Sequence, residues 1–563
     1  MKNKIKIFRK LVRCASIALL SFSMAGCGAD FLDTTPTNNI SGSSIWTKAT
    51  LAEQAVIGVY NVFLDQYCPN SGILDSHRIP WDAYSSVMDT DKNWIKRMPN
   101  CTGAATPSSG LFNDVIDNIG QVPDMSTGEK QRAIAECKFL RAFAYMRLNI
   151  LYKGVPLYMN AITSPENGNK ARSSEADVWA AILQDLTDCV NEPNLPGKYN
   201  SGDSNYGRVT KGAAYALRGQ VYMWQKNWEA AVDDFNSVAD CGFGLYTKAG
   251  ATSYKQLLKI ANEQCEEMIF SVQCIKQYGY SNTRNITYGN RCTAGSMWNN
   301  YLPNPHFVES FETATGEKFN WDNYLPGYSA MKEKERVVFF LRDGLSAAEK
   351  ERMTAYGADM SKYLDSGNEA RIKKAYESRD PRLQMAVITP YAQYNGASSG
   401  IAHTYTLRWP YRGSDSAEPF DIRTDTNDKF YYLWRKFVPE GLEQTERDTY
   451  GLDIPLIRYA EVLLLKAEAL NEWGSTHESE AIRCVNEVRR RAGHVELNNA
   501  TYPATKVNGQ SDLRERIWNE YYWEIGGEDS MYFHELRWGT WKDKKFDNNR
   551  NGLMQMWGET TYT

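Results

Sequence analysis

The sequence predicts an all-α fold, a tetratricopeptide-like helical-repeat scaffold with a large loop-rich insertion that carries the ligand region. Two observations support this prediction. Apolar residues recur every three or four positions in two separate blocks, one before residue 245 and one after residue 450. Between the blocks, Gly, Asn, Tyr and Pro are frequent and helical periodicity is patchy. Loops of this length are usually functional where they occur in compact domains.

The first thirty residues are typical of an export signal. Basic residues without any acidic residue precede a short apolar stretch at 14–25. A segment that crosses a bilayer core needs about 20 apolar residues, and this stretch is shorter. The pattern therefore predicts a secretory signal. The stretch ends at Met24-Ala25-Gly26-Cys27, where small residues precede one cysteine. The polar residues that follow are expected to form a tether.

Composition narrows the function. The chain has 563 residues and a net charge of −4, and removing residues 1–26 takes away six basic and no acidic residues, which leaves −10. A net acidic protein is a poor candidate for nucleic-acid binding, which depends on phosphate neutralisation. The 11 cysteines form no CxxC pair, and Cys137, Cys189 and Cys484 fall on apolar helical faces, where they are expected to be buried. The presence of one or two disulfides is left as an open alternative, because disulfides persist in exported proteins.

Three helices are expected in the first part of the N-terminal block. The first begins at Thr50, which has capping-box spacing to Glu53. The second covers "EKQRAIAECKFLRAFAYMRLNILY" and ends before Gly154 and Pro156. The third is "SSEADVWAAILQDLTDCV", opened by a serine with an aspartate three residues on.

Two helix pairs have the spacing of tetratricopeptide units. In the first pair, Gly219 would let the helices approach and Phe235 would fill the gap. The second pair reads "YAEVLLLKAEALNEWG" and "SEAIRCVNEVRRRAG", and a further helix follows at about 512–524. Because a repeat unit cannot bury its apolar face alone, the two blocks are expected to stack on each other.

No catalytic set assembles from the sequence. None of the six histidines sits in HExxH. "GASSG" at 396–400 matches G-x-S-x-G with Ser398 as the nucleophile, but that motif needs a strand before it and a helix after it, and this polar stretch is expected to be a surface loop. "DTDKN" at 89–93 fails as a calcium-binding loop, since Trp94 stands where Gly is needed. We therefore expect no enzyme activity and no cofactor or metal, although a loose calcium site at 89–93 or 425–428 stays open.

Aromatic residues beside polar ones mark two candidate ligand-binding stretches. Sugars present an apolar C–H face and a rim of hydroxyls, so a binder needs flat rings next to hydrogen-bonding side chains. The candidates of the first stretch are Arg78, Trp81, Tyr84, Asn93 and Trp94, and those of the second are Trp298, Asn299 and Tyr301. The stretches 321–324 and 431–436 are weaker candidates. The alternative is that each tryptophan only packs a loop onto the helical scaffold.

Several motifs in order resemble the SusD/RagB family of outer-membrane nutrient-binding lipoproteins. They are the lipobox-like end of the signal at Cys27, then "FLDTTPTNNIS", "AECKFLRAFAYMRLNILYKGVPLY", "NPHFVESFETATGEKFNWDNYLPGY", "RDPRL" at 379–383 and "IRYAEVLLLKAEALNE" with "VNEVRRRAG". The resemblance covers the chain from Cys27 to about Trp541. It implies a tetratricopeptide scaffold with a loop-rich ligand region.

The resemblance also implies a location and partners. Cys27 would carry the lipid that anchors the protein in the outer membrane, facing the cell exterior. The protein would bind a glycan or oligosaccharide and deliver it to a SusC-like TonB-dependent transporter. The domain organisation expected from this is a signal peptide at 1–26, a helical region at 27–244, the ligand-binding insertion at 245–450 and a C-terminal helical region at 451–563.

One segment departs from the family pattern. Near the end, "NEYYWEIGGEDSMYFHELRWG" keeps Glu520, Glu524 and the final Arg-Trp-Gly. Asp529 and His534 stand where members of the family have other residue types, which puts the ion pairing of the last helix in doubt. Three alternatives to glycan uptake stay open: a peptide-binding uptake subunit, a surface glycoside hydrolase and a bare assembly scaffold.

Overall fold

A computed structural model of the chain describes residues 42–67, 83–85 and 108–544, apart from 165, 278, 283, 295, 300, 399, 413–417 and 424–431. Helices dominate and strands are few and short, which confirms the predicted fold class. No described helix is long and apolar enough to span a membrane. The signal peptide, Cys27 and the calcium candidates at 89–93 and 425–428 lie outside the described residues.

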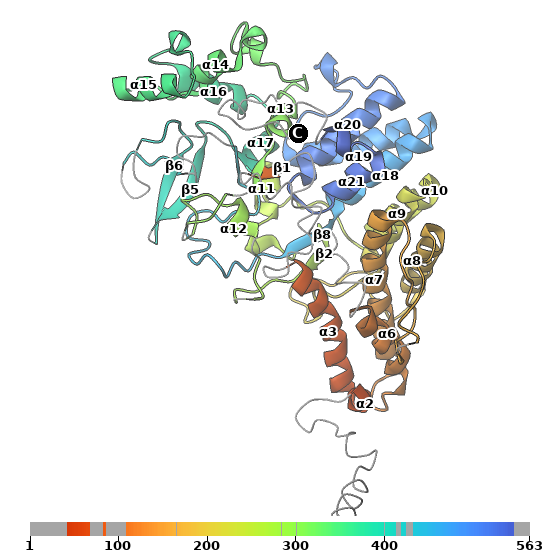
Figure 1. The fold of residues 1–563 in the computed structure, drawn as a ribbon. Coiled ribbons are helices and arrows are strands. Elements are labelled where there is room, and N and C mark those ends of the chain that lie inside the picture. Colours follow the sequence, from red (N-terminus) through yellow and green to blue (C-terminus); the bar gives the residue numbers. More distant parts are fainter. Residues whose placement is uncertain are drawn as a thin grey trace, which may run out of the picture.

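The N-terminal block consists of helices packed side by side (Figure 1). Their bounds are α2 (Gly42–Ile45), α3 (Ala49–Tyr67), α6 (Ser108–Asn118), α7 (Thr127–Tyr152), α8 (Glu175–Asn191), α9 (Lys211–Trp224) and α10 (Trp228–Asp240). Ser174 caps α8 as expected, by accepting from the N–H of Asp177. The start of α3 differs from the expectation, because the carboxylate of Asp124 accepts from the N–H of Ala49 at 2.6 Å and the helix begins there.

The helix pair α9–α10 confirms the predicted role of its glycine. A Cβ atom at Gly219 would lie 2.4 Å from a ring carbon of Phe235, which is closer than any real contact. The ring of Phe235 therefore occupies the space that a side chain at 219 would need. Close packing of this kind leaves no room for even one added methyl group.

The C-terminal block stacks on the N-terminal one, as predicted. Its helices are α18 (Tyr459–Trp473), α19 (Glu478–Ala492), α20 (Gln510–Ile525) and α21 (Met531–Trp538). Helix α10 packs against α18, so the two blocks form one continuous scaffold along the right side of Figure 1. Cys137, Cys189 and Cys484 are buried in it and free, as the sequence predicts.

The middle of the chain lies beside this scaffold and contains short elements joined by long connections (Figure 1). Its helices are α11 (Ser253–Leu257), α12 (Arg284–Tyr288), α13 (Pro305–Ser310), α14 (Glu333–Arg336), α15 (Ala347–Ala355), α16 (Asn368–Glu377) and α17 (Pro381–Ala386). The strands of the described chain are β1 (Ala83–Ser85), β2 (Met268–Val272), β3 (Tyr301–Pro303), β4 (Val387–Ile388), β5 (Gln393–Ser398), β6 (Ile401–Thr406), β7 (Leu433–Trp434) and β8 (Ile454–Arg458). They form four antiparallel pairs, β1–β3, β2–β8, β4–β7 and β5–β6.

The G-x-S-x-G match lies on a β-hairpin, not on the surface loop that we expected. Ser398 ends β5 and Ile401 begins β6, so a strand follows the motif where a nucleophile elbow needs a helix. Each glycine of this motif occupies a position where a larger residue does not fit well. A Cβ at Gly396 would lie 2.4 Å from the carbonyl oxygen of Cys292, and Gly400 has a φ of +77° at the turn.

The "RDPRL" motif contributes to a buried ionic network that holds the middle region on the scaffold. The guanidinium of Arg382, on α17, contacts Asp380 at 2.7 Å, Glu520 at 2.7 Å and Glu524 at 3.4 Å, and all four side chains are fully buried. Because the two glutamates belong to α20, these contacts join the middle region to the C-terminal block. Buried charges are tolerated only where such partners surround them.

The pair β2–β8 extends the network. Arg458 at the end of β8 contacts Glu267 at 2.5 Å and Glu528 at 2.7 Å, and Arg491 contacts Glu267 at 2.8 Å and also pairs with Glu524. Burial on its own would raise the pKa of Glu524, but Arg491 and Arg458 lower it to about 2. The carboxylate is therefore held in its charged form.

The segment that departs from the family pattern finds partners of its own. Asp529, just before α21, pairs with Arg284, and the retained Arg537 pairs with Glu468. Nε2 of His534 lies at hydrogen-bond distance, 2.8 Å, from a carboxylate oxygen of Glu461. Asp529 and Arg537 therefore form ion pairs in this segment, and His534 forms a hydrogen bond.

Candidate functional site

One residue of the first candidate stretch, Tyr84, lies in a strand that pairs with the strand of Tyr301. Strand β1 pairs antiparallel with β3, with Tyr84 opposite Leu302 and Ser85 opposite Tyr301. Neighbouring strands lie about 4.8 Å apart, so the backbones of β1 and β3 are direct neighbours. The two strands are far apart in the chain, and no local sequence pattern indicates their pairing.

The structure describes only part of the predicted site. Arg78, Trp81, Asn93 and Trp94 lie outside the described residues, and the backbone of Tyr84 lies in β1. Trp298 is 42% exposed, whereas Asn299 and Tyr301 are only 1% and 3% exposed. The expectation that the last two lie exposed on a loop is wrong, because the chain turns inward at Asn299, whose φ is +39°, and enters β3.

Trp298 lies in a segment that folds back onto α12. Its N–H donates to the carbonyl of Ile286 at 2.8 Å, and the N–H of Asn299 donates to the carbonyl of Gly289 at 2.8 Å. A Cβ at Gly289 would lie 2.6 Å from the carbonyl oxygen of Asn285, so only glycine fits this close approach. The two hydrogen bonds tie the backbone that carries the exposed indole to α12 and to the residue that follows this helix.

Arg447 contacts the exposed ring. Its guanidinium carbon lies 5.5 Å from the centre of the Trp298 ring, a cation–π distance. The amide of Asn285 donates to the backbone carbonyl of Arg447 at 3.3 Å, which ties this segment to α12. The Arg447 side chain also contacts the carboxylate of Asp448 at 3.4 Å, and the two side chains are 39% and 48% exposed. An aromatic ring, a fork of N–H donors and a carboxylate therefore meet at one surface position.

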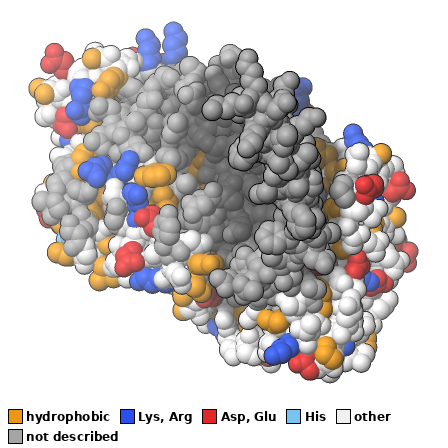
Figure 2. All heavy atoms as spheres, turned by 60° about the horizontal axis from the view of Figure 1, so that its bottom comes forward, with side chains coloured by type: hydrophobic (Ala, Val, Ile, Leu, Met, Phe, Trp, Pro, Cys, Tyr) orange, Lys and Arg blue, Asp and Glu red, His pale blue; other side chains and the backbone are white. Residues whose placement is uncertain are grey.

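This arrangement suits a sugar. The indole offers a flat apolar face, and the guanidinium and carboxylate beside it offer donors and acceptors for hydroxyl groups. A ring that stacks on a ligand contributes about 1–3 kcal/mol. The described part of the face drawn in Figure 2 carries acidic, basic and hydrophobic side chains in mixture, so its charge is not of a single sign.

Three aromatic residues of the weaker candidate stretches pack inside the protein. Trp321 is buried and donates from its indole N–H to Glu309 at 3.0 Å. Tyr432 and Trp434 are fully buried, and the Trp434 ring stacks on Tyr288 with 5.5 Å between ring centres. For these residues the alternative of packing, rather than ligand contact, is confirmed.

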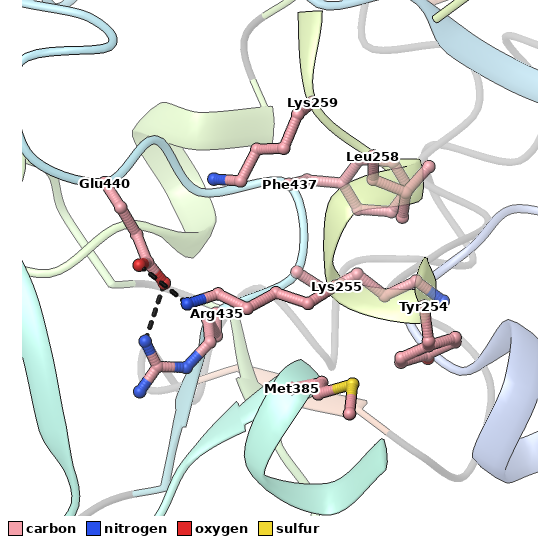
Figure 3. Close-up of a pocket in the computed structure, with 9 residues that line it drawn as sticks. Tyr254, Lys255, Leu258, Lys259, Met385, Arg435, Phe437 and Glu440 are labelled. Carbon is pink, nitrogen blue, oxygen red and sulfur yellow. Dashed lines mark hydrogen bonds and ion pairs between the residues drawn. The ribbon is translucent and has the colours of Figure 1, made fainter. Parts of the chain in front are cut away.

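A pocket beside α11 serves the fold rather than a ligand (Figure 3). Lys255 and Arg435 point at the same carboxylate, that of Glu440, at 2.9 and 2.6 Å, and Lys259 contacts Glu443 at 2.9 Å. The free volume is about 10 Å³, which suffices for about one water molecule. Its charges are matched, and its role is to fasten α11 to the segment after β7.

Metal-binding groups do not assemble in the described part of the chain. There, no set of three or more His, Cys, Asp and Glu side chains is arranged to hold an ion. The acidic residues of the buried network face arginines and Lys436 instead of one another. The described residues at Trp298 offer a stacking face, N–H donors and a carboxylate.

Sequence reasoning missed the arginine that lies over Trp298. Arg447 lies in "EQTERDTYG", which carries no aromatic cluster, and only the fold brings it to the ring.

Two family models match the chain. One, described as the SusD family, matches residues 266–563, and another, described as starch-binding and associating with the outer membrane, matches residues 30–223. A curated relative, SusD-like protein P25 of Formosa agariphila, is 21% identical over 559 residues, which cover 93% of this chain and 89% of that protein.

Solved structures share the fold. A SusD-like protein from Bacteroides fragilis superposes with a TM-score of 0.66 at 22% identity, over 90% of this chain and 89% of that one. A SusD-like carbohydrate-binding protein from the same species superposes with a TM-score of 0.64 at 21% identity, over 89% of this chain and 88% of that one. At such identities the likeness extends to the architecture alone.

Proposed function

Because this chain belongs to the SusD family, we propose that it captures a glycan or oligosaccharide outside the cell and passes it on without cleaving it. The observation that carries this proposal is the exposed Trp298 ring with the guanidinium of Arg447 beside it. A second support is the carbohydrate binding named for one structural relative. Both observations support a role as a binding subunit for polysaccharide utilisation.

The same proposal includes an outer-membrane location. The lipobox-like sequence before Cys27 provides a lipid attachment point, and acyl chains anchor by burying CH₂ groups at about 0.8 kcal/mol each. One of the matching family models is described as associating with the outer membrane. The recipient of the glycan would be a SusC-like TonB-dependent transporter. Labelled palmitate incorporated into the wild-type chain, but not into a Cys27→Ala variant, would support the anchor.

The function is tested by what the protein retains. The purified full-length chain is incubated in detergent with oligosaccharide mixtures from several polysaccharides and with a peptide digest, and bound and free fractions are analysed by mass spectrometry. We expect bound oligosaccharides whose masses match those of the input. Retention of peptides alone would favour the peptide-binding alternative, and shortened products would favour a surface glycoside hydrolase.

A further inference from the structure

A small cavity lies between the loop that precedes α9 and strand β2. The loop supplies Tyr199, Arg208 and Thr210 to the cavity lining, and the strand supplies Phe270 and Ser271. The free volume is about 20 Å³, and one water molecule needs about 10–15 Å³ of such volume. The cavity therefore has room for one water at the contact between the N-terminal block and β2.

Two hydroxyl groups in this lining have no protein partner. The Oγ atom of Ser271 and the phenol oxygen of Tyr199 are both buried, and neither forms a hydrogen bond with another described residue. Ser271 as a whole is only 6% exposed. A buried hydroxyl without a partner costs free energy, and native proteins pair the large majority of such groups. Because the two hydroxyls come from different segments of the same lining, one small molecule between them could pair both.

The lining also restricts the chemistry of that molecule. A hydroxyl group both donates and accepts, so a molecule that does the same satisfies it best. Arg208 lines the cavity too, and its positive charge disfavours a cation there. The same guanidinium already pairs with Glu136 at 2.9 Å and with Glu53, so an anion would gain little from it. A neutral molecule of the size of water fits these conditions.

We propose that one ordered water bridges the hydroxyl groups of Ser271 and Tyr199 and thereby joins the loop before α9 to β2. A bridging water contributes nearly as much as a direct hydrogen bond. The inference is independent of the proposed function, since the cavity takes no part in the Trp298 site. Two competing explanations are that both hydroxyls stay unpaired and that each has a separate partner.

The explanations differ in the sign of a mutational effect. If the hydroxyl groups share a water, removing either one breaks the bridge and destabilises the protein. If they are unpaired, removing a hydroxyl also removes the cost of burying it, and the protein becomes more stable or stays unchanged. If each has its own partner, the two losses are independent and add.

The test is a double-mutant cycle, measured by urea unfolding of the full-length chain in detergent. The variants are Ser271→Ala, Tyr199→Phe and the two combined, and each substitution removes only a hydroxyl oxygen. Ser253→Ala combined with Tyr199→Phe is the control cycle. Ser253, on α11, is another fully buried serine whose Oγ has no partner among the described residues, and it does not line this cavity.

We expect Ser271→Ala and Tyr199→Phe each to lower the urea midpoint. The combined variant should lose less than the sum of the two, because the first substitution already breaks the bridge. In the control cycle the effects of Ser253→Ala and Tyr199→Phe should add. A crystal structure of the wild type should show one water within about 2.6–3.2 Å of both oxygens.

Three results would overturn the inference. A midpoint that rises or stays unchanged in either single variant means that the hydroxyl concerned is unpaired. Losses that add in the combined variant mean that the two groups share no partner. A crystal structure in which the two oxygens bond each other directly, or in which no water contacts both, contradicts the bridge.

Discussion

Tyr84 lies opposite Leu302 in the antiparallel pair β1–β3, although one comes from the N-terminal region and the other from the middle of the chain. Residues that face each other in such a pair have Cα atoms about 4.5–5.5 Å apart. This pairing joins Tyr84 of the first candidate stretch to the strand that holds Tyr301 of the second. It also positions Trp298, which precedes β3 by three residues.

The pairing can be tested with a disulfide. Ala83 faces Pro303 in the same register, and opposed Cα atoms lie within the range that a disulfide spans. The double variant Ala83→Cys/Pro303→Cys is expected to form this cross-link under mild oxidation, detected by peptide mass spectrometry without reduction. Each single variant serves as a control. Failure of the double variant to cross-link would contradict the register.

The helix contact at Gly219 predicts a stability effect. Gly219→Ala is expected to destabilise the protein by about 1–3 kcal/mol, because the new methyl group collides with Phe235. Gly58 in α3 is the matched control, since nothing lies within 4 Å of its Cβ position. Gly58→Ala should stabilise by up to about 1 kcal/mol. Urea unfolding measures both, and equal effects would contradict the packing account.

The buried ionic network predicts a larger effect. Glu524→Gln should lower the free energy of unfolding by about 3–5 kcal/mol, because it leaves Arg458 and Arg491 without full charge compensation. The exposed pair Lys318–Glu515, with 3.5 Å between the charged atoms, is the control. Glu515→Gln should change the stability by less than about 1 kcal/mol. Comparable losses in the two variants would mean that burial does not strengthen the network.

The same glutamate predicts a pH dependence. Burial opposes the charged form of Glu524, yet its arginine partners lower the pKa of this carboxyl group to about 2 in the folded protein. In the unfolded chain a glutamate has a pKa of about 4.3. As the pH falls from about 5 to 2, the unfolded chain takes up the proton first, so the stability that the charge contributes is lost in this interval.

Comparison with Glu524→Gln isolates that contribution. Burial raises the pKa of Glu136 and of Asp185, and these two groups act in the opposite direction. The wild-type curve alone therefore does not report on Glu524. The difference in unfolding free energy between wild type and variant should be constant above about pH 5 and narrow towards pH 2. A difference independent of pH would contradict the assigned pKa.

The sequence predicts the scaffold well because helical periodicity and packing glycines are local patterns. The α7 and α8 helices and the contact of Gly219 with Phe235 follow from residues close together in the chain. The stacking of the two blocks follows from the apolar face that a repeat unit cannot bury alone. The hairpin at Ser398 was missed because its polar residues alternate with few apolar ones. There, burial of Tyr394 and Tyr405 outweighs local propensity.

The site is less predictable for a physical reason. Trp298 is a candidate because the residues around it are polar. Asn299 and Tyr301 lie in the same polar stretch, yet both are buried. Exposure here depends on a backbone turn and on a strand partner that is distant in sequence. Arg447 reaches the ring by the same kind of long-range contact, and a local pattern does not encode it.

The central claim, that the Trp298 ring binds a glycan, is tested most directly by the dissociation constant of a retained oligosaccharide for wild type, Trp298→Ala and Trp473→Ala. Trp473, on α18, is 38% exposed and serves as the matched tryptophan on the scaffold. We predict that Trp298→Ala weakens binding about 5- to 150-fold, the effect of one stacked ring, and that Trp473→Ala leaves it unchanged. Unaltered affinity in folded Trp298→Ala protein would contradict the claim.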